Sequence, residues 1–128
     1  MRPQIIEPAA SPKPVGPYSH AVRVREFLFS SGQIPLTKDG KLVDGGIREQ
    51  TKQVLENLSV ILHEQSLTFE NVVKTTVFMT DLGEFAEMNA IYGEYFRANF
   101  PARSTIQVAA LPRGARVEIE AIACYPTP

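Results

Sequence analysis

The stretch from Pro101 to Cys124 constrains the fold most, because it has the pattern of two strands joined by a turn. Side chains on a strand point alternately to opposite faces. In the first strand, one face would carry Arg103, Thr105 and Gln107, and the other Ser104, Ile106 and Val108. In the second, the apolar face would carry Val117, Ile119, Ala121 and Ala123, with Glu118 and Glu120 opposite. We therefore expect each strand to give one face to the core. If both strands lie in one sheet, the arginine and the carboxylates could share a polar surface suited to chemistry.

The rest of the chain predicts a single α+β domain over residues 1–128. Period-two and β-branched patterns predict strands at 21–24, 27–31 and 72–80, and a short earlier strand is an option. Apolar residues at helical spacing predict helices over 47–65 and from 81 to 96. This order fits one sheet with two helices packed on a single face. The other face would mix apolar and charged residues, which suggests contact between subunits.

Three further positions are candidates for a site, each with a simpler structural alternative. Tyr18 ends a proline-rich arm and could cover a pocket or only pack the arm down. Ser31 and Gly32 follow a predicted strand, where a glycine lets backbone approach a ligand or marks a bulge. Asn89 lies beside an apolar helical stripe, so its amide needs a partner in the fold or in a site.

Composition excludes several classes of function. With 13 Lys and Arg against 14 Asp and Glu, the chain has no bulk charge to attract nucleic acid or anionic membranes. It has no zinc-ligand spacing and no phosphate-loop or dinucleotide glycine pattern, so we expect neither a metal nor a cofactor. Its single cysteine and the lack of a signal-peptide pattern or an apolar run of about 20 residues predict a cytoplasmic protein. An arginine near carboxylates remains, as a carboxylate-binding site or as a structural ion pair.

These residues resemble the RidA family, also called YjgF, over nearly the whole chain. The resemblance is carried by short motifs in the family's order, namely Gly16-Pro17-Tyr18-Ser19, Ser31-Gly32-Gln33-Ile34-Pro35, Val73-Lys74-Thr75-Thr76-Val77-Phe78, Pro101-Ala102-Arg103-Ser104 and Val117-Glu118-Ile119-Glu120-Ala121. It implies a chorismate-mutase-like α+β fold assembled as a homotrimer. In that assembly the three sheets would face a central barrel, and an active cleft would lie at each subunit interface.

The resemblance also implies 2-iminobutanoate/2-iminopropanoate deaminase activity without a cofactor. Such an enzyme hydrolyses reactive 2-imino acids and their enamine tautomers, including 2-aminoacrylate, to 2-keto acids and ammonia. Arg103 would bind the substrate carboxylate, and Glu118 would orient or activate the attacking water. The family's other pocket positions correspond to Tyr18, Ser31, Gly32, Asn89 and Thr105.

The chain departs from the family's common pattern at two positions. Thr105 stands where many members have cysteine, and His20 stands where glutamine is common. Two alternatives to the deaminase remain open, because some relatives are described as RNA-cleaving translation inhibitors or chaperone-like proteins, and others could bind a small acid without hydrolysing it. The acidic balance argues against RNA, and Arg103 favours hydrolysis over simple binding.

Overall fold

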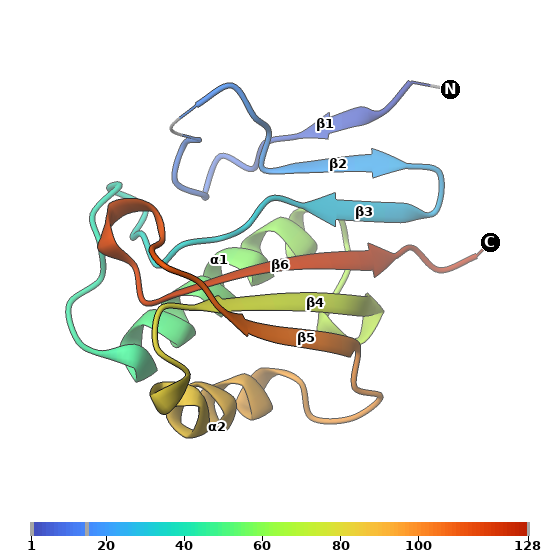
Figure 1. The fold of residues 1–128 in the computed structure, drawn as a ribbon. Helices are drawn as coiled ribbons and strands as arrows, with labels where there is room; N and C mark the ends of the chain where they lie inside the picture. The colour runs from blue at the N-terminus through green and yellow to red at the C-terminus, as the bar shows by residue number, and fades with distance from the viewer. Residues whose placement is uncertain (1, 15, 128) are drawn as a thin grey trace.

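The computed structural model describes residues 2–14 and 16–127, which form a six-stranded mixed sheet with two helices (Figure 1). The strand order is β1-β2-β3-β6-β4-β5. The strands are β1 (Gln4–Ile6), β2 (Ala21–Val24), β3 (Phe27–Ser30), β4 (Val72–Met79), β5 (Ala102–Gln107) and β6 (Val117–Cys124). Only β4 and β5 pair in parallel, and the other neighbours are antiparallel. The expected α+β class is therefore confirmed, including the short first strand.

Both helices cover the same face of the sheet, as expected. Figure 1 shows α1 (Ile47–Glu64) behind the sheet and α2 (Phe85–Tyr95) along its β5 side. The apolar side of each helix is buried against alternate residues of β4 and β6. The fully buried members of this core include Val54, Leu55, Leu58, Ile61, Val77, Met79, Met88, Val117 and Ile119. Helical spacing thus predicted the packed faces correctly, including the stripe on α2.

The pairing of the last two strands differs from the expectation. β5 and β6 are not neighbours, because β4 lies between them. The apolar face of β6 is buried as predicted, but Ile106 of β5 is 44% exposed, so the core face predicted for β5 was wrong. A parallel pair needs a crossover connection, which α2 supplies. The resulting register sets Ile106 beside Phe78, on the face away from the helices.

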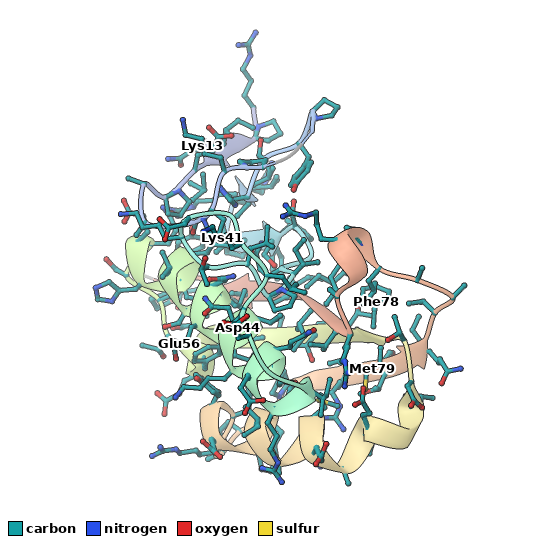
Figure 2. All side chains as sticks on the ribbon, turned by 90° about the vertical axis from the view of Figure 1, so that its left-hand side faces the viewer. Lys13, Lys41, Asp44, Glu56, Phe78 and Met79 are labelled. Atoms are coloured by element: carbon teal, nitrogen blue, oxygen red, sulfur yellow. The ribbon has the colours of Figure 1, made fainter. Side chains whose placement is uncertain are left out.

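That open face combines exposed apolar side chains with carboxylates, as the sequence predicted. Phe27, Phe29 and Ile106 are between 37% and 44% exposed, and Glu118 and Glu120 share their face. Figure 2 shows Glu56 of α1 on one side of the sheet and Phe78 on the other. Among the described residues, no helix is long and apolar enough to cross a membrane.

Candidate active site

Arg103 is held at the edge of the sheet by side chains of α2. Its backbone pairs with Thr75 of β4, which is fully buried, so its side chain points toward the helices. Nη1 donates a hydrogen bond of 2.8 Å to Oδ1 of Asn89, and the guanidinium carbon lies 4.7 Å from the centre of the Tyr92 ring. The amide and the ring hold the guanidinium from two directions. The partner that the Asn89 amide was expected to need is therefore the Arg103 guanidinium.

A hollow of about 490 Å³ opens beside this guanidinium, where the loop before β5 crosses α2. Its lining includes Asn89, Tyr92, Phe100 and Arg103. Among the described residues the salt bridges are Arg48–Glu87 and Arg116–Glu84, so Arg103 has no carboxylate partner. A cation held in place without a counter-charge can bind an anionic ligand.

Tyr92 supports this arrangement and was predicted only as a core residue. Its hydroxyl lies 2.8 Å from the Thr75 hydroxyl, which ties α2 to β4. Burial raises the pKa of Tyr92 although Thr75 and Arg103 oppose that shift, so the phenol stays neutral. Tyr92 follows Asn89 by three residues, and residues at this spacing are neighbours on the surface of a helix. That spacing is the feature of the sequence that could have indicated a contact between Tyr92 and the partner of Asn89.

Thr105 lies two residues beyond Arg103 on the same face of β5, where it pairs with Val77 and is half-buried. We call Asn89, Arg103 and Thr105 the arginine half-site. Its three members come from α2 and β5, and all lie on the helix side of the sheet.

Glu118 lies on the open face, in close contact with Gly32. Its backbone pairs with Phe78 of β4. A Cβ at Gly32 would overlap the Glu118 carboxylate, so any other residue at this position would force the Glu118 side chain to move. The adjacent Gln33 exchanges two backbone hydrogen bonds with Ile119, of 2.8 and 3.2 Å, and these fix the glycine beside β6. The expected close approach at Gly32 is present, and the group it approaches is the carboxylate.

The environment of Glu118 favours a carboxyl that binds protons more tightly than usual. Burial is the main cause that raises its pKa, and the negative charge of Glu120 adds to the effect. A carboxylate with a raised pKa is a stronger base, which suits it to accept a proton from water.

Ser31 and Tyr18 lie near Gly32 but differ in how they are engaged. The Ser31 hydroxyl donates to the carbonyl of Ser19 at 2.5 Å, so it fixes the preceding loop. Tyr18 is 47% exposed and, with Gly32 and the buried His20, lines a small hollow of about 30 Å³. We call Tyr18, Ser31, Gly32 and Glu118 the glutamate half-site.

The two half-sites do not meet within one chain, so the expectation of a shared polar surface was wrong. Arg103 aligns with Thr75 of β4 and Glu118 with Phe78, three positions along and on the opposite face. Strand geometry puts their Cα atoms about 10 Å apart along the strands and about 10 Å apart across them. The physical reason is that β4 lies between β5 and β6. Its pairings direct the side chain of Arg103 to the helix side of the sheet and that of Glu118 to the open face.

The described residues contain no group of three or more His, Cys, Asp and Glu side chains that could hold a metal ion. The side chains of the two half-sites can support anion binding, through the Arg103 guanidinium, and proton transfer, through the Glu118 carboxyl.

Comparison with known proteins gives consistent matches over almost the full length. A family model described as Endoribonuclease L-PSP matches residues 8–125. A human protein named 2-iminobutanoate/2-iminopropanoate deaminase is 49% identical over 121 residues, which cover 94% of this chain and 88% of that protein. A RutC family protein of Pyrococcus abyssi is 46% identical and covers 96% of this chain and 98% of its own.

Solved structures match equally well. The crystal structure of the yeast protein YEO7 has a TM-score of 0.95 at 40% identity, covering 98% of this chain and 100% of that one. The structure of TdcF from Escherichia coli with bound serine has a TM-score of 0.91 at 38% identity, covering 96% of this chain and 99% of that one.

Proposed function

This chain belongs to the Endoribonuclease L-PSP family, also called YjgF or RidA, and from that premise we propose that it hydrolyses 2-imino acids to 2-keto acids and ammonia. The observation that carries the proposal is the Arg103 guanidinium, held by Asn89 and Tyr92 beside a hollow and without a carboxylate partner among the described residues. Relatives between 48% and 50% identical to this chain are named 2-iminobutanoate/2-iminopropanoate deaminase.

Arg103 binds the carboxylate that all these substrates share. The planar guanidinium can donate two parallel hydrogen bonds to a carboxylate, which fixes the orientation of the imine carbon as well as its position. Asn89 keeps the guanidinium in place before the substrate arrives. Thr105, on the same strand face, offers a hydroxyl that can donate to the bound acid.

Glu118 activates the water. It takes a proton as the water oxygen bonds to the imine carbon, and the electrons of the C=N double bond move to nitrogen, which is protonated. The resulting carbinolamine then collapses: the C–N bond breaks, ammonia leaves, and the hydroxyl loses its proton to form the keto group. Glu118 can hold and return the proton in both steps because its raised pKa matches such transfers better than that of an exposed glutamate.

A second copy of the chain completes the site. A four-carbon acid is no longer than two extended residues, roughly 7 Å, so it cannot contact Arg103 and Glu118 of one chain across the sheet. We propose that the arginine half-site of one subunit faces the glutamate half-site of its neighbour in a homotrimer, so that the two together form one active site. The exposed apolar side chains of the open face, from β3 and β5, support this assembly, because contact with another subunit would remove them from water.

A cytoplasmic location is part of the proposal. Cys124 is free, which suits a reducing compartment.

The direct test generates 2-iminobutanoate in place with a threonine dehydratase and follows its disappearance. We expect the wild type to accelerate the decay and Arg103→Ala to lose at least about thirtyfold in kcat/KM, because a buried charged contact to the substrate is worth about 2–5 kcal/mol. Arg97→Ala is the matched control, since Arg97 is exposed and its Nε donates to a carbonyl at the end of α2.

Circular dichroism should show that both variants remain folded. Full activity of Arg103→Ala would remove the carboxylate clamp from the mechanism. Decay at the spontaneous rate with wild-type protein would instead favour a protein that binds small acids without hydrolysing them.

A further inference from the structure

Three arginines line a hollow at one end of the sheet, away from both half-sites. Figure 1 shows the β2–β3 turn and both termini at this end. The hollow has a volume of about 490 Å³, within the usual range for small-ligand sites. Its lining residues are Arg2, Gln4, Arg23, Arg25, Glu26, Tyr125, Pro126 and Thr127. We call this the terminal arginine hollow.

Arg23 is fixed in position from two sides. Its guanidinium carbon lies 3.7 Å from the centre of the Tyr125 ring, and its Nε donates a 3.1 Å hydrogen bond to the carbonyl of Arg25. Tyr125 is itself anchored, since its hydroxyl donates to Oε1 of Gln65 at 2.7 Å. Arg25 has a positive φ of 54°, which belongs to the tight turn that brings its carbonyl to Arg23. The guanidinium of Arg23 is therefore held in a fixed place at the hollow, where its terminal nitrogens can donate to a ligand.

The charge of this hollow is not balanced. It contains three arginines and one acid, Glu26, although the whole chain has a net charge of −1. Neither of the two salt bridges formed by the described residues involves these arginines. Three guanidiniums lining one hollow repel one another where the described residues give them no salt-bridge partner, and an anionic ligand would reduce that repulsion.

We propose that the terminal arginine hollow binds the phosphate group of a small organic phosphate. A phosphate carries up to two negative charges and presents three or four oxygens, so it can accept hydrogen bonds from several guanidiniums at once, whereas a carboxylate has only two oxygens. The Gln4 amide and the Thr127 hydroxyl add neutral donors for the rest of the ligand.

A strand of RNA fits the hollow less well, although it carries phosphates too. Proteins that bind single strands stack bases on exposed aromatic rings. Tyr125 is only 9% exposed and Arg23 occupies one face of its ring, so no base can stack there. The hollow therefore suits a compact phosphate rather than a polynucleotide.

This site is independent of the proposed deaminase. Arg23 aligns with Leu28, so it lies off the open face, and β3, β6 and β4 separate its strand β2 from β5, which carries the arginine half-site. The terminal arginine hollow shares no lining residue with the hollow beside Arg103, so its ligand does not compete with a substrate there.

The test titrates the full-length protein with pyrophosphate by calorimetry and by amide NMR at about 0.15 M salt. The variants are Arg23→Gln and Arg25→Gln. Arg25 lies in the exposed turn, so its variant keeps the test decisive if Arg23→Gln fails to fold. Arg97→Gln controls for loss of one surface charge, and Arg103→Gln controls for binding at the arginine half-site.

We expect saturable binding that weakens about tenfold or more in Arg23→Gln and Arg25→Gln and stays unchanged in both controls, because each variant removes a charged hydrogen-bond donor. Amide shifts should centre on residues 23–26 and 125. No saturation by about 10 mM pyrophosphate, or loss of binding in Arg103→Gln, would overturn the proposal.

Two further ligands test the selectivity. Citrate that binds as tightly as pyrophosphate would overturn the preference for phosphate. The second ligand is a single-stranded RNA without terminal phosphates. If it binds through the same arginines and more tightly than pyrophosphate, the proposal of a small phosphate is wrong and the ligand is a polynucleotide.

Discussion

At the scale of single residues, the surroundings of Arg103 and Glu118 suit their proposed roles in different ways. Arg103 is positioned by contacts with Asn89 and Tyr92, while Glu118 is tuned by burial and by Glu120. The family motifs pointed to Arg103, Asn89 and Glu118 from the sequence. The supporting hydroxyls of Tyr92 and Thr75 were not predicted, because an aromatic at helical spacing has the same pattern whether it only packs or also holds a catalytic group.

The raised pKa of Glu118 predicts an acid limb in the rate profile. The ordinary pKa of this group is 4.5, and in the folded protein it is raised. The base form is lost as the pH falls through the raised pKa, so below it kcat/KM should fall about tenfold per pH unit. Rates measured from about pH 4 to 8 on wild type and Glu118→Gln give the test. The variant should be slow throughout and show no such limb, and a limb that persists in Glu118→Gln would assign it to another group.

The same shift has a consequence for stability, which provides a second readout. The folded state binds this proton more tightly than the unfolded state, so the stabilisation is fully present below pH 4.5 and is lost as the pH rises through the folded pKa. Glu118→Gln should therefore melt at a higher temperature than wild type near neutral pH. The difference should vanish in acid.

At the scale of secondary-structure elements, the bond between Thr75 and Tyr92 joins β4 to α2. Each single variant, Thr75→Val or Tyr92→Phe, leaves the other buried hydroxyl without its partner and should lower the free energy of unfolding by about 1–3 kcal/mol. The double variant removes both groups and should lose clearly less than the sum of the two. Urea unfolding of all four proteins measures this coupling, and additive losses would show that the bond contributes nothing.

The elements themselves could largely be predicted, but their order in the sheet could not. Periodicity depends on neighbours in the sequence, and it located α1, α2 and β4 to within a few residues. The place of β5 depends on a parallel pairing with β4 across the α2 crossover, which no local pattern specifies. That single pairing decides which face Arg103 occupies, so it explains why one expected polar surface became two half-sites.

At the scale of the whole molecule, a shared site predicts that two inactive variants restore each other. Arg103→Ala and Glu118→Gln would be co-expressed in equal amounts with different tags, and mixed assemblies would be purified through both tags. If subunits mix at random, each site in the whole population has an intact arginine and an intact glutamate about one time in four, so roughly a quarter of wild-type activity should return. The purified mixed assemblies should be somewhat more active than that average.

Each variant expressed alone is the control, together with a double variant co-expressed with wild type. Mixed assemblies as inactive as the separate variants would place the whole site within one chain. Light scattering on the same samples reports whether the assembly is a trimer.

The separation of Arg103 from Glu118 across one sheet also bears on when activity begins. If the site is shared between subunits as proposed, a newly made single chain carries both reactive groups but stays inactive, as a zymogen does, although it needs no cleavage. Activation would then require only assembly with further copies, so the concentration of the protein would set both the amount of enzyme and the threshold at which it begins to work. Below that threshold, dilution alone keeps the chemistry latent.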